Sequence, residues 1–346
     1  MKTLRKILYP FSFLYGEIVT IRNKLYDKGV LRSTSFDIPI IVVGNLSVGG
    51  TGKSPQIEYL VRLLQNDYKI AVLSRGYKRK TKGFIIANEN STVKQIGDEP
   101  MQFFRKFKNI IVAVDADRVN GINQLKILPN KPDIILLDDA YQHRKVEAGY
   151  NILLTPYHKL YIDDTMLPAG DLREKVSGAN RAQVIIVTKC PGYLTEEEQF
   201  KIADKLQPEM HQTVFFSKIA YAETIKGLKK IKIDELHAYK VLLVTGIAKT
   251  KPLSEFLNTE KIDFQHLKYS DHHDFTRKDL AKIQNTFNQI KSDKKLILTT
   301  EKDYVRAFDS TYKNIYFLPI ETTFLDHQND FNTLIKNYVE QSSRNS

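Results

Sequence analysis

Short apolar runs recur between residues 39 and 188, separated by longer segments in which apolar and polar positions follow a helical spacing. Most of the runs are continuous, and continuous runs of valine, isoleucine and leucine are typical of strands buried on both faces of a parallel sheet. The pattern therefore predicts βαβ units, with helices on both faces of a mostly parallel sheet. The predicted strands are residues 39–44, 70–74, 110–115, 134–138, 152–155 and 184–188.

The pattern changes after Phe216. A lysine-rich segment, 218–232, contains short strand-like pieces and is typical of a connector or ribbon. A second α/β set follows it, in which Thr276 has the side chain of a helix N-cap. Its predicted strands are 241–245, 296–300 and 316–320, and its predicted helices are 276–291 and 330–340. We therefore expect an α/β protein of four parts: an N-terminal segment 1–30, a core 31–216, a connector 217–236 and a smaller C-terminal α/β lobe 237–346.

Composition is that of an ordinary globular protein. The 346 residues are enough for two domains, and 42% hydrophobic residues can supply a sizeable core. The single cysteine, Cys190, excludes an internal disulfide framework. The formal net charge of +12 favours an anionic partner, such as nucleic acid, an anionic membrane surface or a phosphorylated substrate, unless the basic residues only form a solvated face.

The N-terminal segment is apolar over residues 7–15, which is shorter than the roughly 20 residues of a transmembrane helix. Pro10 interrupts it and no small-residue cleavage site follows, so we expect neither a membrane span nor a signal peptide. Apolar residues continue to Leu25, interleaved with lysine and arginine. Two interpretations remain for residues 1–25: an amphipathic helix in a membrane interface, and a helix that packs on its own domain.

The strongest chemical signal is a glycine-rich turn after the first predicted strand. It ends in Gly52-Lys53-Ser54 and precedes a helical pattern at 56–64, which is the arrangement of a phosphate-binding loop. In such a loop the backbone N–H groups approach phosphate oxygens, the lysine reaches the β- and γ-phosphates, and the serine ligates Mg²⁺. Ser47 stands where the general pattern has glycine. The candidate nucleotide-binding residues are Ser47, Val48, Gly49, Gly50, Thr51, Gly52, Lys53 and Ser54.

A phosphate loop also predicts an acidic residue at the end of a later buried strand, where it supports the bound Mg²⁺. Residues 134–137 are apolar and run into Asp138 and Asp139, which fits this prediction unless the pair is simply an Asp-rich turn. The adjoining segment 140–144, which includes Gln142, adds the hydrogen-bonding His143 and the cation Arg144 beside the expected phosphate site.

Two titratable clusters have both a functional and a structural interpretation. Asp98 and Glu99, just before Pro100, either supply a catalytic and a metal-binding carboxylate or cap a helix. His272 and its neighbour His273, between two aspartates, either transfer protons near neutral pH or belong to a helix start. The sequence has no second His or Cys set at the spacing of a zinc site.

Two further charged segments follow predicted turns or strands. Arg173, next to Glu174, either clamps a phosphate or forms a surface ion pair. Residues 299–306 are expected to end a strand in a polar, charged loop. Open α/β sheets bind ligands beyond the carboxyl ends of their strands, so this loop is a candidate for ligand contact.

Together these motifs resemble those of the tetraacyldisaccharide 4′-kinase family, the lipid A 4′-kinases of Gram-negative bacteria. They occur in the family's order and span nearly the whole chain, and the family accepts serine at the position of Ser47. One segment departs from the family, because Ala140-Tyr141 stands where Gly-Phe is common. The matching segments are VGNLSVGGTGKSP (43–55), LSRGY (73–77), GDEP (97–100), LDD (137–139), QH (142–143), LPAGDLRE (167–174), DHH (271–273) and TTEKD (299–303).

The resemblance implies a P-loop NTPase-like fold and an enzyme that uses ATP and Mg²⁺ to phosphorylate the 4′-hydroxyl of a lipid A disaccharide 1-phosphate. It also implies a place at the cytoplasmic face of the bacterial inner membrane, peripheral or monotopic. The inner-membrane surface and the lipid are the implied partners. Neither nucleic acid nor an obligate protein partner is expected.

The resemblance also implies roles for the candidate residues. Asp98 is the implied general base, with His272 as its partner. The implied Mg²⁺ site is made of Ser54, Asp138, Asp139 and Glu99. The implied site-lining residues are Gln142, His143, Arg173 and Glu174.

The main alternative is a P-loop ATPase of the assembly or partitioning type at the membrane, which has no lipid acceptor. Such proteins often carry a second lysine early in the loop, where this chain has Val48. A small GTPase is disfavoured because residues 184–191 lack the Asn-Lys-x-Asp pattern that reads guanine. A nucleic-acid binder is disfavoured because no recognisable module accompanies the basic clusters.

Overall fold

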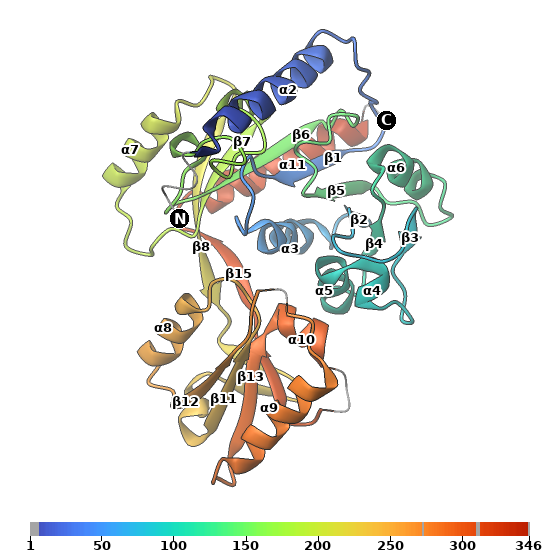
Figure 1. Ribbon diagram of the computed structural model, residues 1–346. Helices are drawn as coiled ribbons and strands as arrows, with labels where there is room; N and C mark the ends of the chain where they lie inside the picture. Colours follow the sequence, from blue (N-terminus) through green and yellow to red (C-terminus); the bar gives the residue numbers. More distant parts are fainter. Residues whose placement is uncertain (1–6, 272, 309–311, 345–346) are drawn as a thin grey trace. The chain divides into compact units, whose positions relative to one another are not determined.

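The computed structural model describes residues 7–271, 273–308 and 312–344. The chain divides into two compact units, and Figure 1 labels most of their helices and strands. The first unit draws on Met1–Ile96, Phe103–Ala220 and Thr322–Ser346, and the second on Gly97–Gln102 and Tyr221–Glu321.

Within the described residues, the first unit is built on a nine-stranded sheet in the order β15-β8-β7-β6-β1-β5-β2-β4-β3. The strands from β8 to β4 pair in parallel, and β3 pairs antiparallel with β4. The fold class predicted from the continuous apolar runs is confirmed. The strand bounds are β1 Ile40–Gly44, β2 Ile70–Ser74, β3 Ile85–Ile86, β4 Ile111–Val114, β5 Ile134–Asp138, β6 Tyr150–Pro156, β7 Val184–Thr188, β8 Thr213–Tyr221 and β15 Ile320–Phe324.

Helices connect these strands and flank the sheet. Helix α3 packs on β1 and β5, and α6 packs on β2. Helix α6 begins at an N-cap, Asp117, whose carboxylate accepts hydrogen bonds from two backbone N–H groups. The helices are α2 Tyr9–Asp27, α3 Lys53–Leu64, α4 Val93–Ile96, α5 Asp98–Lys106, α6 Arg118–Lys126, α7 Glu196–Leu206 and α11 Gln328–Arg344, with short 3₁₀ turns η1 Tyr161–Asp163 and η2 Val176–Arg181.

The register of the central strands brings their carboxyl ends to one edge of the sheet. Strand β1 lies between β5 and β6, with Val43 opposite Asp138 on one side and Ile152 on the other. Because all three strands run in parallel, the loop after β1 begins beside the acidic end of β5. This is where open α/β sheets bind their ligands.

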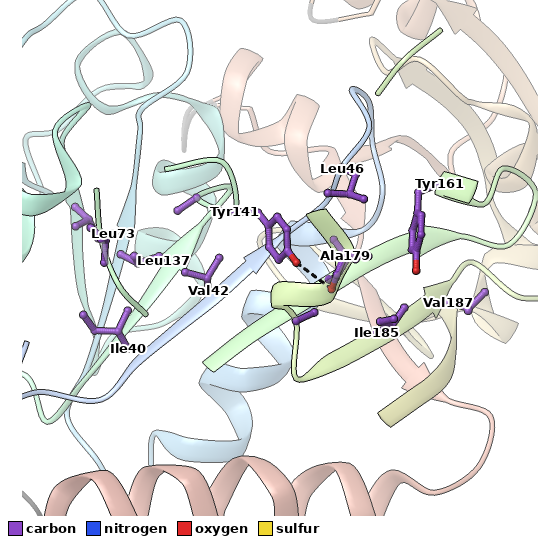
Figure 2. Packing of buried hydrophobic residues seen from close by; sticks show 14 of the residues in the cluster. Ile40, Val42, Leu46, Leu73, Leu137, Tyr141, Tyr161, Ala179, Ile185 and Val187 are labelled. Atoms are coloured by element: carbon purple, nitrogen blue, oxygen red, sulfur yellow. Dashed lines mark hydrogen bonds between the residues drawn. The ribbon is translucent and has the colours of Figure 1, made fainter. Parts of the chain in front are cut away.

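The core beside this edge is closely packed. Figure 2 shows Val42, Leu137 and Ile185 among its buried side chains. Tyr141 is 4% exposed, and its hydroxyl donates to the carbonyl oxygen of Gly178 at 2.8 Å. The Ala-Tyr pair that departs from the family pattern therefore places a phenol where it can satisfy a buried carbonyl.

The second unit has its own sheet, in the order β10-β9-β14-β13-β11-β12 within the described residues. Strands β12, β11, β13 and β14 pair in parallel, whereas β9 and β10 form an antiparallel ribbon. The elements are β9 Thr224–Lys226, β10 Lys230–Lys232, η3 Asp234–Ala238, β11 Lys240–Thr245, α8 Lys251–Thr259, β12 Phe264–Lys268, α9 Arg277–Gln289, β13 Lys295–Thr300, α10 Glu301–Ala307 and β14 Ile315–Leu318.

Two local predictions in this unit have different outcomes. Thr276 is the N-cap of α9, and it forms a capping box with Asp279, so the predicted helix start is confirmed. The loop expected at 299–306 is wrong, because the residues after Thr300 form helix α10. The Thr300 side chain accepts a hydrogen bond from the Asp303 N–H and so begins the helix directly at the strand end.

The units divide the chain differently from the ranges expected from sequence. The strand expected at 316–320 is two strands, β14 and β15, because Pro319 has no N–H to continue the ladder. Strand β15 joins the sheet of the first unit, where its Phe324 and Phe331 of α11 pack on Tyr59. The lysine-rich ribbon belongs to the second sheet through the pairing of β9 with β14. Asp98, expected in the core 31–216, belongs to the second unit.

Candidate active site

The loop between β1 and α3 has the backbone of a phosphate-binding loop. Gly49 and Gly52 have φ values of +113° and +100°, a region that favours glycine because it has no Cβ. The first turn of α3 then directs N–H groups and the positive end of the helix dipole toward the loop. Glycine at these two positions is therefore required by the chain path.

A second segment, residues 166–173, pairs with this loop through backbone hydrogen bonds. The Val48 N–H donates to the Asp171 carbonyl, and the Arg173 N–H donates to the Leu46 carbonyl, each at 2.7 Å. These two bonds form a short antiparallel bridge at Ser47. Ser47 therefore uses its backbone to pair with the neighbouring segment, which accounts structurally for a loop that lacks the first glycine.

Lys53 lies among polar groups at the loop. Its Nζ donates to Oδ1 of Asn45 at 3.1 Å and lies 3.5 Å from Oδ1 of Asp139. The Nη1 of Arg173 donates to the same Asp139 oxygen at 3.0 Å. Two cations thus meet one carboxylate beside the helix N-terminus, and a phosphate placed here would be neutralised by Lys53 and Arg173. Arg173 forms an ion pair, and the same contact places it at the phosphate loop.

Oxygen donors suited to Mg²⁺ lie at the same edge. Asp138 ends β5 and is 3% exposed, and the Ser74 hydroxyl donates to its Oδ2 at 3.2 Å. Ser54 is 4% exposed in the first turn of α3. Within the described residues no group of three or more His, Cys, Asp or Glu side chains could hold a metal by itself. Mg²⁺ usually takes one or two carboxylates together with substrate phosphates, so these residues fit that ion.

Arg118, which the sequence reasoning did not single out, lies beside the acidic end of β5. It is 2% exposed at the start of α6, and it donates to the carbonyls of Asp115 at 2.6 Å and Asp138 at 3.5 Å. Burial lowers the pKa of its guanidinium to about 10, so it remains charged at neutral pH. The signal that could have found it is the charged run Asp-Ala-Asp-Arg directly after a predicted parallel strand.

Buried Glu174 and half-buried Gln142 form a hydrogen-bonded support for the loop. Glu174 is fully buried, and its carboxylate accepts hydrogen bonds from Gln142, Arg181 and Asn23, each at 2.9 Å. The Gln142 amide also donates to the Asn45 carbonyl at 2.8 Å. Through Gln142, Glu174 therefore connects helix α2 to Asn45, whose side chain contacts Lys53.

His143 lies near Arg118. Burial lowers the pKa of its imidazole to about 4, with Arg118 contributing in the same direction, so the ring is neutral at pH 7. It lines a cavity of about 560 Å³ together with Arg32, Arg144 and Arg181. A neutral imidazole can donate one hydrogen bond and accept another, but it would not retain a second proton at neutral pH.

The remaining candidate residues belong to the second unit. Asp98 contacts Arg306 through Oδ2 at 2.5 Å, and Glu99 contacts Lys302 at 2.8 Å. His272 lies outside the described residues. Its neighbour His273 contacts Asp279 of the α9 capping box at 3.0 Å, which is the helix-start interpretation of that histidine.

A parallel sheet with a glycine-rich phosphate loop after its central strand, and an acidic strand end beside it, defines the P-loop class of nucleotide-binding proteins. The chain belongs to the tetraacyldisaccharide 4′-kinase family, since the model of that family, described as Tetraacyldisaccharide-1-P 4′-kinase, matches residues 4–340. The family expected from the motifs is thereby confirmed.

Curated relatives and a solved structure agree with this assignment. Tetraacyldisaccharide 4′-kinase of Flavobacterium johnsoniae is 55% identical over 99% of both chains, and that of Flavobacterium psychrophilum is 51% identical over the full length of both. The crystal structure of the "apo" form of LpxK from Aquifex aeolicus in complex with ATP covers 97% of this chain and 99% of its own, with a TM-score of 0.79 and 29% identity.

Proposed function

We propose that this protein transfers the γ-phosphoryl group of ATP to the 4′-hydroxyl of a tetraacyldisaccharide 1-phosphate, which forms lipid IVA in lipid A biosynthesis. The observation that carries the proposal is the family match over residues 4–340. A partitioning-type ATPase is not favoured, because a family of lipid kinases accounts for nearly the whole chain and not only for its phosphate loop.

Phosphoryl transfer depends mainly on positioning and on neutralising charge. Lys53 contacts the β- and γ-phosphate oxygens, and the loop N–H groups hold the rest of the phosphate chain. Ser54, Asp138 and Asp139 would hold Mg²⁺. When bound, Mg²⁺ neutralises charge on the β- and γ-phosphates. The Aquifex aeolicus structure in complex with ATP supports ATP as the nucleotide.

The acceptor side of the reaction is assigned to other residues. Asp98 accepts the proton of the 4′-hydroxyl, and His272 is its partner. Glu99 contributes to the metal site, and Gln142 and His143 line the site. The support for these roles is the match of their motifs to the family pattern. A carboxylate is a competent proton acceptor when it is held within hydrogen-bond reach of the hydroxyl.

Helix α2 is proposed to dock on the inner-membrane surface from the cytoplasmic side. Its inner face packs on residues 166–175 of its own unit, where the Ser12 hydroxyl accepts from the Ala169 N–H at 2.8 Å and the Tyr15 hydroxyl donates to the Arg173 carbonyl at 3.0 Å. Its outer face is an exposed apolar stripe with helical spacing: Phe11, Leu14, Ile18 and Ile21. No helix among the described residues is long and apolar enough to cross a membrane.

Replacing Phe11, Leu14 and Ile18 together by serine is expected to weaken binding to anionic vesicles roughly 100-fold or more, since each buried large apolar side chain contributes about 1.5–3 kcal/mol. Sedimentation with vesicles measures this binding. High salt is expected to weaken the binding of the unchanged protein as well, because basic residues near the helix attract anionic lipid.

The matched control is Phe200→Ser, which removes an equally exposed phenylalanine from α7 of the same unit. It is expected to sediment like the unchanged protein. Full sedimentation of the triple variant would contradict the role of α2.

The kinase reaction is tested by incubating the purified protein with Mg-ATP and tetraacyldisaccharide 1-phosphate. Mass spectrometry and phosphorus NMR are expected to show one added phosphate at the 4′ position. An absence of transfer, while a relative of known activity works in the same mixture, would refute the proposed function.

A further inference from the structure

Helix α10 and the N-terminal half of α5 are held together by three side-chain contacts, all within the second unit. Arg306 contacts Asp98, Lys302 contacts Glu99 at 2.8 Å, and Gln102 contacts Glu301 at 3.5 Å. The charged segment 299–306 thus has an intramolecular partner in the acidic turn that carries Asp98. This partner accounts for its charges without a ligand.

The contact between Arg306 and Asp98 is well defined. The Nε and Nη2 groups of Arg306 both donate to Oδ2 of Asp98, at 3.1 and 2.5 Å. The Arg306 side chain is 7% exposed and that of Asp98 is 22% exposed. Two donors on one rigid planar group restrain the direction of the carboxylate more than a single lysine ammonium can.

Arg306 is itself anchored by a buried carboxylate. Its Nη1 donates to Oδ1 of Asp303 at 3.2 Å, and Asp303 is fully buried. Oδ2 of Asp303 accepts from the Gly246 N–H and from the Thr300 hydroxyl, each at 2.8 Å. Asp303 is therefore tied to the ends of β11 and β13, and it holds the guanidinium in one place.

Burial and hydrogen bonding have opposite effects on the charge of Asp303. Burial raises the pKa of Asp303, while the donors from Gly246 and Thr300 and the charge of Arg306 act in the opposite direction. Because the buried Asp303 carboxylate accepts hydrogen bonds from three donors, a neutral side chain would replace it poorly. Arg306 therefore bridges a fixed structural carboxylate and a partly exposed one, Asp98.

We propose that Arg306 is a positioning residue for Asp98: its guanidinium, fixed by Asp303, orients the carboxylate that accepts the proton of the acceptor hydroxyl. This inference rests on the proposed function, in which Asp98 is the proton acceptor. Arg306 acts through Asp98 and needs no contact with either substrate. Its contribution therefore belongs to the transition state, in which the proton moves, and not to the binding of ATP or lipid.

The test is a double-mutant cycle on the full-length protein. Arg306→Met is expected to lower kcat ~10–100-fold, as misplacement of a reacting group does. The KM values for ATP and lipid are expected to stay within about twofold, because the lost interaction is made only in the transition state. In the Asp98→Asn background the same substitution is expected to change kcat less than about threefold, since the carboxylate that it positions is absent.

If Arg306 had only a structural role, its substitution would lower kcat by the same factor with or without Asp98. If the losses from Arg306→Met and Asp98→Asn multiply, or if Arg306→Met keeps the full kcat, the inference is overturned. Arg306→Lys supplies a variant that retains the charge, and it is expected to recover part of the kcat that methionine loses. A folded Arg306→Lys protein with no more activity than Arg306→Met would also overturn it.

The control variant is Lys240→Met. It breaks the exposed ion pair of Lys240 with Asp263 in the same unit, and its kcat is expected to be unchanged. Failure of the proposed function looks different from failure of this inference. In the first case the unchanged protein transfers no phosphate, or Asp98→Asn keeps its kcat. In the second case the unchanged protein transfers phosphate and Asp98→Asn loses kcat, but the effect of the Arg306 substitutions does not depend on Asp98.

Discussion

Replacing Lys53 by methionine is expected to lower kcat/KM for phosphoryl transfer ~10²–10³-fold, the loss that follows removal of one preorganised donor to developing charge. The ammonium group lies between Asn45 and Asp139, at the start of α3. Without it, charge on the transferred phosphoryl group is less well neutralised. Initial rates with labelled ATP and the lipid acceptor measure the effect.

Folding is expected to change little in this variant. The Lys53 and Asp139 side chains are 11% and 32% exposed, and a partly exposed ion pair of this kind contributes at most about 1 kcal/mol. Lys126→Met serves as the control, because it breaks an exposed lysine–aspartate pair with Asp37 in the same unit. Equal rates for Lys53→Met and Lys126→Met would contradict the assignment of Lys53 to the phosphate site.

Replacing Glu174 by alanine is expected to destabilise the first unit by about 3 kcal/mol, the usual result of removing one partner from a buried ion pair. The carboxylate is fully buried, and three donors would lose their acceptor together. Its surroundings are tight, since a Cβ added at Gly178 would lie 2.7 Å from Glu174 Oε2. Urea unfolding followed by circular dichroism measures the loss.

The same substitution is expected to raise the KM for ATP, because Gln142 and Asn45 lose the support that holds them beside Lys53. The control is Glu17→Ala, which breaks the exposed pair of Glu17 with Lys175, the residue next to Glu174. An exposed pair contributes about 0–1 kcal/mol, so this variant should unfold near the normal urea concentration. A Glu174→Ala protein that is as stable as Glu17→Ala would show that the buried network does not support the loop.

Local sequence patterns predicted much of the fold because continuous apolar runs and capping residues report on burial and helix ends over a few residues. Strands β2, β5 and β7 have the bounds expected from their apolar runs, and Thr276 caps α9. The prediction was wrong at 299–306, where the charged residues form a helix. Their charges are satisfied by a segment some 200 residues away, which a local pattern cannot reveal.

The candidate site divides in the same way. The glycine-rich turn and the acidic strand end could be predicted from the sequence, because each motif depends on backbone geometry at neighbouring positions. Arg118 was not singled out, because a charged run does not show that its side chain donates to the end of another strand. The assignment of Asp98 to the second unit was likewise hidden, because helix α5 continues across the boundary between the two units.

The amino-acid order alone therefore predicted a P-loop α/β protein, the phosphate loop with Lys53 and the acidic strand end at Asp138. These features arise from short-range periodicity and from motifs with fixed spacing. Only the three-dimensional contacts show the pairing of Glu174 with Gln142, of Arg118 with the Asp115 carbonyl and of Arg306 with Asp98, on which their proposed roles rest. Those roles depend on burial and on long-range pairing of charges, and both exist only once distant segments of the chain have packed together.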